Sequence, residues 1–214
     1  MTGRQWGTRR DAMLARIIAV ARAQVQHGDG VSLRRVAIDL RITPPALYRY
    51  VASRDQLLDL VIDAIDCDIE QHVAAAVDAQ VRRDATSALV SALRAYRSWA
   101  LESPAEFRLL LQQHSGRRHP GTGCADHLRS VRYVVDLAAR GRVSLAELGD
   151  DARAGLHVRL AQVFGVVCLE AFGHVDARVV ASGGLFDEAT AALDGAERRS
   201  VRDHGEREPS DPIF

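Results

Sequence analysis

The stretch SLRRVAIDLRITPPALYRY, from Ser32 to Tyr50, decides the fold of this chain, because it predicts two short helices joined by a tight turn. Ser32 is a capping residue, and the apolar residues after it share one helix face, namely Leu33, Val36, Ala37 and Leu40. Thr43 caps the second helix, and Pro44 suits its first position because the missing N–H would have no partner there. Residues 41–43 alone remain for the turn, so the helices must cross steeply. This pattern predicts a helix-turn-helix, whose second helix can enter a DNA major groove.

A longer pattern surrounds this stretch and covers roughly the first quarter of the chain. It consists of Val31-Ser32, Val36-Ala37, Leu40, Ile42-Thr43, Leu47-Tyr48, Tyr50-Val51 and Ser53-Arg54-Asp55-Gln56-Leu57-Leu58. The pattern resembles the DNA-binding domain of TetR-type transcriptional regulators. The resemblance implies an all-α fold, in which an N-terminal three-helix helix-turn-helix domain is joined to a C-terminal helical ligand-binding and dimerisation domain. The sequence departs from the family at Arg41, where the family usually has glycine, a residue that accepts a left-handed backbone without penalty.

Charge is distributed unevenly along the chain. Residues 1–54 contain ten arginines and three aspartates, a net charge of +7, while the whole chain of 214 residues is neutral. A basic N-terminal segment followed by an acidic remainder suits a protein that contacts nucleic acid through its N-terminal part. No apolar run approaches the roughly 18 residues of a membrane span, and the N-terminus lacks an apolar signal core. The three widely spaced cysteines suit reduced thiols, so we expect a cytoplasmic protein with no membrane partner.

Helical spacing predicts the domain organisation. Helices are expected at about 9–26, 53–79, 84–102, 125–140, 150–172 and 184–199, with a short helix after Ser103-Pro104 and a loop at 114–124. The predicted domains are 1–53 for DNA binding, 54–199 for effector binding and dimerisation, and a disordered tail at 200–214. Residues 1–8 are predicted to be an arm, which either contacts phosphates or is a free terminus.

The predicted DNA contacts fall into two groups. Arg34 and Arg49 suit guanine edges, to which arginine donates two hydrogen bonds, and Pro44, Pro45 and Ala46 suit thymine methyl groups. Phosphate contacts are expected from Tyr48, Tyr50, Arg35 and Arg54, with Ser32 and Thr43 at the two caps. The alternative is that Tyr48 is a core residue and that the arginines merely solvate a surface.

Residues after position 54 suggest two further candidate sites, a small-molecule pocket and a metal site. Apolar and aromatic residues at helical spacing suggest a small-molecule pocket, with plain core as the alternative, and the residues are Tyr96, Trp99, Phe107, Leu110, Gln113, His114 and Phe164. The segments 96–107 and 164–174 are similar to the WHG-type subgroup of TetR ligand domains, although the Trp and His of that name are absent. His114, His119, Cys124 and His127 are zinc-ligand types, but their spacing matches no standard site, so no metal is expected.

The predicted helix at 150–172 carries apolar side chains around most of its circumference, which favours partners on more than one side. With the last helix it predicts a two-fold, four-helix interface in a homodimer, and the alternative is a core helix of a monomer. The interface residues are Val163, Gly165, Val166, Leu169, Phe186, Ala189 and Leu193.

The sequence shows no nucleophile elbow, phosphate loop or paired catalytic carboxylates, so neither an enzyme nor a cofactor is expected. We expect a homodimeric regulator that binds a palindromic DNA operator, more specifically a repressor released by an unknown small apolar or aromatic effector. The alternative functions are an orphan regulator without an effector and a helical ligand-binding protein that does not act on DNA.

Overall fold

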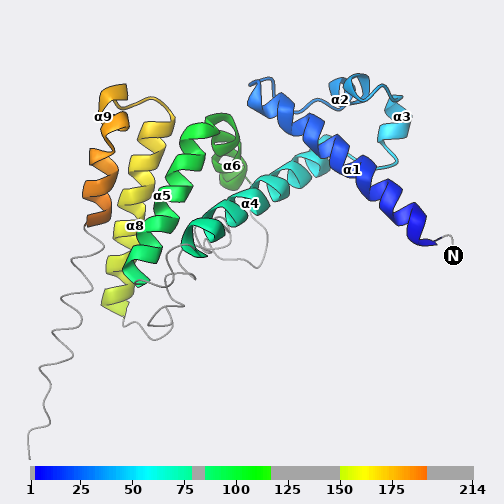
Figure 1. Ribbon diagram of the computed structural model, residues 1–214. Helices are drawn as coiled ribbons and strands as arrows, with labels where there is room; N and C mark the ends of the chain where they lie inside the picture. Colours follow the sequence, from blue (N-terminus) through cyan, green and yellow to red (C-terminus); the bar gives the residue numbers. More distant parts are fainter. Residues whose placement is uncertain (1–2, 79–84, 117–149, 192–214) are drawn as a thin grey trace, which may run out of the picture. The chain divides into compact units, whose positions relative to one another are not determined.

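A computed structural model describes residues 3–78, 85–116 and 150–191, and every regular element in these ranges is a helix (Figure 1). The predicted all-α fold class is confirmed. The chain divides into two compact units, the first formed by residues 1–72 and 102–132 and the second by residues 73–101 and 133–214. The first unit includes residues on both sides of the predicted domain boundary between residues 53 and 54. The assignment of DNA binding to residues 1–53 and of effector binding and dimerisation to residues 54–199 stays a prediction. In the described ranges, no helix has the length and apolar character that crossing a membrane requires.

Helix α1 spans Gly3–Gln26, so it starts before the predicted position and the expected arm at residues 1–8 is wrong from Gly3 onward. No proline interrupts this segment, and Arg4 and Gln5 are good helix formers, which outweighs the cost of Gly7. Ile17, Ala21 and Val25 are buried at a spacing of four residues. The helix ends at Gln26, and Gly28 follows with a φ of 81°, which allows the chain to reverse.

The predicted helix-turn-helix is confirmed as α2 (Leu33–Asp39) and α3 (Pro44–Leu47). Helix α2 packs against both α1 and α3. Its buried residues come from the face that the sequence assigned to the core, and they join neighbours from the flanking segments: Val31, Val36, Ala37, Leu47 and Val51. The opposite face of the motif is therefore left to solvent.

Helix α4 spans Arg54–Asp78 and is capped by Ser53. The Ser53 Oγ accepts a hydrogen bond from the Gln56 amide at 3.1 Å, while the Gln56 side chain accepts one from the amide of Ala52 instead of Ser53. Burial recurs every four residues along the helix, at Leu57, Val61, Ile65, Ile69, Val73 and Val77. Residues 54–72 of α4 belong to the first unit and residues 73–78 to the second.

A polar cluster inside the first unit joins α1 and α4 to α6, which spans Pro104–Gly116. The Glu106 side chain is 0% exposed, and its carboxylate accepts hydrogen bonds from Arg22 Nε at 2.7 Å and Nη2 at 2.9 Å. Gln26 Nε2 donates a third at 2.8 Å, and Arg22 Nη1 also pairs with Asp68 of α4. The hydrogen bond to Glu106 raises the pKa of Arg22 above its ordinary value, against the opposing effect of burial.

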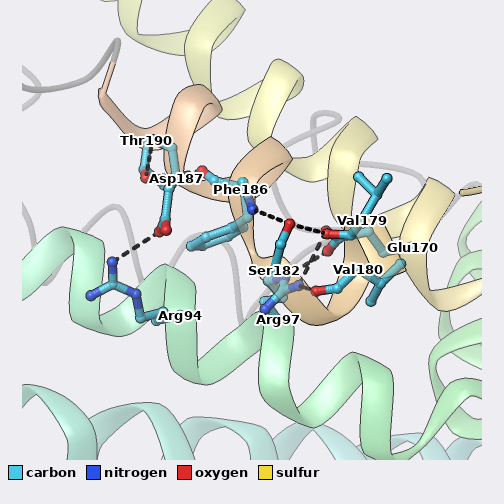
Figure 2. A network of polar contacts seen from close by, with 10 residues as sticks. Arg94, Arg97, Glu170, Val179, Val180, Ser182, Phe186, Asp187 and Thr190 are labelled. Atoms are coloured by element: carbon cyan, nitrogen blue, oxygen red, sulfur yellow. Dashed lines mark hydrogen bonds and ion pairs between the residues drawn. The ribbon is translucent and has the colours of Figure 1, made fainter. Parts of the chain in front are cut away.

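The second unit contains α5 (Ala85–Glu102), α8 (Asp150–Ala171), α9 (Ala177–Ser182) and a helix described over residues 184–191. Figure 2 shows how Arg97 of α5 joins these helices, because its guanidinium donates to both oxygens of the buried Glu170 carboxylate, at 2.6 and 3.1 Å, and to the Val180 carbonyl at 2.9 Å. The same guanidinium lies 5.3 Å from the centre of the Phe186 ring. Arg94 pairs with Asp187 at 3.0 Å on the exposed side.

Helix boundaries in this part of the chain largely follow the sequence prediction. Helix α6 continues to Gly116, so the loop expected at 114–124 is wrong for residues 114–116, and its remaining residues lie outside the described ranges. The sequence analysis missed α9, whose signals are the Asp176 cap and Gly183, a left-handed residue after the last turn. The helix expected at 125–140 and the tail at 200–214 lie outside the described residues.

Candidate nucleic-acid interface

Both helices of the motif are capped by the predicted side chains. The Ser32 Oγ accepts a hydrogen bond from the Arg35 amide at 3.5 Å, and the Thr43 Oγ1 accepts one from the Ala46 amide at 3.4 Å. Pro44 occupies the first turn of α3, as expected. Behind α2, the buried Gln24 accepts a hydrogen bond from the Ser32 amide at 3.0 Å, which ties the start of α2 to α1. The outer face is thus presented by a backbone fixed at several points.

The structure divides the arginines of the motif into two classes. Arg35 pairs with Asp29 at 2.6 Å, and Arg54 Nε donates to the Val31 carbonyl at 2.8 Å. Arg34, Arg41 and Arg49 are exposed, and their guanidinium groups form no hydrogen bond or ion pair with any residue that the structure describes. Three cations of the motif are therefore available to an outside partner.

The remaining predicted contacts lie on this outer face. Tyr48 is 55% exposed, so its reading as a core residue is wrong. Thr43, Pro44 and Pro45 are exposed, and Ala46 and Tyr50 are half-buried. Ile38 of α2 is 63% exposed, four residues after Arg34 and therefore on the same side of the helix. The face thus combines free cations with apolar and aromatic side chains.

The turn between the two helices has a left-handed residue. The Arg41 amide donates to the Ile38 carbonyl at 3.0 Å, and the Ile42 amide donates to the Ala37 carbonyl at 2.9 Å. This pair of bonds defines a Schellman motif, which requires a left-handed residue at the position after the cap. That residue is Arg41, with φ of 56°. The sequence analysis noted Arg41 as a departure from the family but did not include it among the DNA contacts.

The residues predicted for an effector pocket are divided between the two units. In the second unit, the ring of Tyr96 lies 6.1 Å from that of Trp99 and 6.4 Å from that of Phe164, between ring centres. Tyr96 and Trp99 are buried and Phe164 is half-buried. Phe107 and Leu110 are buried residues of the first unit. Gln113 and His114 lie on α6, and their side chains are outside the described part.

The residues predicted for dimerisation separate into buried and accessible ones. Val163 and Phe186 are buried within the protomer, so their assignment to an accessible interface is wrong. Gly165, Val166 and Ala189 are half-buried, Leu169 is 47% exposed, and Leu193 lies outside the described residues. Since an α-helix advances about 100° per residue, Leu169 lies on the face of α8 opposite Val163 and Val167. Helix α8 therefore has a buried apolar face and an accessible one.

A metal site gains no support from the described ranges, which hold no group of three or more His, Cys, Asp or Glu side chains placed to bind an ion. His119, Cys124 and His127 lie outside these ranges. Of the described cysteines, Cys67 is exposed, and burial raises the pKa of the Cys168 thiol.

Comparison with known proteins gives matches to regulatory proteins. Residues 89–193 match the family model described as the tetracyclin repressor-like C-terminal domain. HTH-type transcriptional regulator Rv1816 of Mycobacterium tuberculosis and HTH-type transcriptional regulator Mb1846 of Mycobacterium bovis are each 38% identical to this chain over 109 residues. These matches cover 49% of this chain and 47% of each regulator, so the chain spans about half the length of the curated relatives it matches.

A solved structure shows the same fold. The crystal structure of the protein SCO4313 aligns with this chain with a TM-score of 0.57 and 24% identity. The alignment covers 88% of this chain and 98% of SCO4313. The helix-turn-helix at residues 32–50 and the match at residues 89–193, which covers just under half of the chain, make this chain similar to TetR-type transcriptional regulators.

Proposed function

We propose that this protein is a sequence-specific DNA-binding regulator that acts by binding and not by catalysis. The observation that carries the proposal is the outer face of the helix-turn-helix, where Arg34, Arg49 and the exposed Tyr48 have no partner among the described residues. Exposed cations at this density attract phosphates, and arginine also suits guanine edges. The net charge of +7 on residues 1–54 adds long-range attraction to the same end of the chain.

The outer face supports a division between base and phosphate contacts. Arg34 and Arg49 are proposed to contact bases, with Pro44, Pro45 and Ala46 beside thymine methyl groups. Tyr48, Tyr50 and the arginines 35 and 54 are proposed to contact phosphates. Arg35 and Arg54 each retain N–H groups beyond those bound to Asp29 and Val31, because a guanidinium has five.

Arg34→Ala is expected to weaken operator binding by about 1–3 kcal/mol and to relax the preference at one base position per half-site. Its neighbour Arg35 provides a matched control on the same helix, since Arg35→Ala should weaken binding to all sequences alike. Both variants are compared with the unmodified protein by selection from a random DNA pool, followed by affinity measurements on the enriched duplexes. Equal sequence preference in all three proteins would contradict the proposed division.

A homodimer is the proposed form on DNA, because a palindromic operator offers two equivalent half-sites. Helix α8 supports this form. Val158 and Leu169 are 59% and 47% exposed, on the face opposite the buried one, and Gly165 lies between them. A Cβ atom built at Gly165 meets no described atom within 4 Å, so this surface is open among the described residues and can admit a second helix at close range.

Repression released by a small apolar or aromatic ligand is the proposed regulatory mode. The cluster of Tyr96, Trp99 and Phe164 offers aromatic surface on α5 and α8, suited to a flat or lipophilic compound. Helix α4 contributes to both compact units. We therefore propose that ligand binding acts through α4 to change the separation of the two helix-turn-helix domains in the dimer. The ligand must bind the released state more tightly than the DNA-bound state, because it acts through that difference alone.

A true effector is expected to quench Trp99 fluorescence and to lower operator affinity by the factor by which operator lowers effector affinity. Trp6 and Trp99 are the two tryptophans of the chain, so a Trp6→Phe variant reports on the second unit. Compounds are screened with this variant by fluorescence and by release of labelled operator. An effector that releases DNA and leaves Trp99 fluorescence unchanged would place the pocket elsewhere.

Two other functions remain as alternatives. An orphan regulator would bind operator, but no compound would alter that binding. A helical ligand-binding protein without a DNA role would show no salt-dependent binding to any duplex. Selection from a random DNA pool distinguishes the proposed regulator from a ligand-binding protein without a DNA role. The effector screen distinguishes it from an orphan regulator.

A further inference from the structure

The turn residue Arg41 stands where the chain elsewhere uses glycine. Helices α1 and α8 end with the same pair of hydrogen bonds as α2, and their left-handed positions are Gly28 and Gly173. Among the described residues, Arg41 is the one non-glycine residue with a positive φ. Glycine adopts this backbone freely, whereas a residue with a Cβ atom is strained there. Arg41 therefore stands against the local backbone preference.

No side-chain hydrogen bond or ion pair with the described residues accounts for an arginine at this position. The Arg41 side chain is exposed and forms no hydrogen bond or ion pair with the residues that the structure describes. The neighbouring arginines on the same motif differ, because Arg35 is held by Asp29 and Arg54 by the Val31 carbonyl. A side chain that costs backbone strain and pairs with none of the described residues is best explained by a partner outside the protein.

We propose that Arg41 is an additional phosphate contact, which anchors the helix-turn-helix on duplex DNA through the turn. The inference rests on the proposed DNA-binding function and adds a contact that the motif predicted from sequence did not include. Arg41 lies two residues before Thr43, whose cap starts the proposed recognition helix, and it follows the exposed pair Arg34 and Ile38 on α2. A cation at this point fixes the register of α3 without reading the base sequence.

A set of three variants tests charge and backbone separately. Arg41→Gly removes both the charge and the left-handed strain, Arg41→Gln removes the charge alone, and Arg41→Lys keeps a charge. The probe is a duplex enriched from a random pool by the unmodified protein, and its affinity is measured from low to moderate salt. In a dimer each substitution acts twice, so loss of one phosphate contact per protomer should make the slope of log K against log salt shallower by about 1.8.

Arg41→Gln and Arg41→Gly are expected to bind this duplex at least about tenfold more weakly at low salt, with unchanged sequence preference and the shallower slope. Arg41→Lys is expected to keep the original slope. Arg41→Gly should also melt about 2–4 °C higher than the unmodified protein, because glycine relieves the strain. Higher stability with weaker DNA binding is a combination that a purely structural role for Arg41 would not produce.

Two results would overturn the inference and leave the DNA-binding function standing. One is an unmodified protein that selects a duplex while Arg41→Gln binds it with the same affinity and salt slope. The other is an Arg41→Gly variant that is less stable than the unmodified protein, since Arg41 would then serve the fold. If the unmodified protein enriches no duplex at all, the proposed function fails together with the inference.

Discussion

Arg22→Ala is expected to lower the free energy of unfolding by about 3–5 kcal/mol, because it leaves the buried Glu106 carboxylate without its guanidinium. The pair is bidentate, at 2.7 and 2.9 Å, and the carboxylate keeps one hydrogen bond, from Gln26, when Arg22 is removed. The loss is measured as the shift in urea midpoint at a fixed protein concentration, since a dimer's stability depends on concentration. A shift below about 1 kcal/mol would contradict the burial of this pair.

Two matched variants separate the stability contribution of the buried Arg22–Glu106 pair from that of the exposed Arg22–Asp68 pair. Asp68 also pairs with Arg22, but its side chain is 52% exposed, so Asp68→Ala should cost no more than about 1 kcal/mol. The double substitution Arg22→Met with Glu106→Leu removes both charges and should recover most of the loss. The raised pKa of Arg22 means that its contribution is fully present below the ordinary arginine pKa, so it should not vary with pH near neutrality.

The Arg22–Glu106 pair also shows where sequence reasoning ends. The two residues are 84 positions apart, and each reads as an ordinary surface charge on its own helix. Periodicity places apolar residues on faces, but it cannot match one buried cation to one buried anion across such a distance. Asp66 illustrates the same limit, because an aspartate in a helix is ordinarily a surface residue and the structure buries this one.

Local signals were sufficient where the structure depends on neighbouring residues. Ser32, Thr43 and Ser53 cap helices as their side-chain chemistry predicts, and the left-handed turn falls at Arg41. The same signals were present for α9 in Asp176 and Gly183, so that helix was predictable and was missed. Availability of a side chain is different, since only the fold distinguishes the free Arg34 from the paired Arg35.

Which face of α8 is buried is likewise a tertiary property. The sequence showed apolar residues around most of the helix, and it counted Val163 and Phe186 with the dimer contacts. In the structure both pack inside the protomer, Phe186 against the Arg97 guanidinium. The side chains left exposed on the other face, Val158 and Leu169, therefore provide the sharper test of association.

Leu169→Glu is expected to convert a dimer, with twice the 23.4 kDa chain mass, into a monomer, and to weaken binding to a full palindrome by about 10²- to 10⁴-fold. The charge would be buried without a partner in the two-fold contact, while in the protomer it points to solvent. A monomer has a single helix-turn-helix domain, so it loses the intramolecular binding to the second half-site. Its affinity for an isolated half-site should stay unchanged. Sedimentation at micromolar concentration and titrations with both duplexes measure these effects.

Two further variants decide whether the effect comes from the accessible face of α8. Gly165→Phe adds bulk where the protomer has open space, so it should weaken association and leave the protomer's fold intact. Ala75→Glu adds the same charge as Leu169→Glu at an exposed position of α4, and it should leave both mass and affinity unchanged. A Leu169→Glu protein that remains a dimer would move the interface away from this face. A monomer that still binds the full palindrome tightly would show that the two half-sites are not read by a preformed pair, and the proposed dimer would then be wrong.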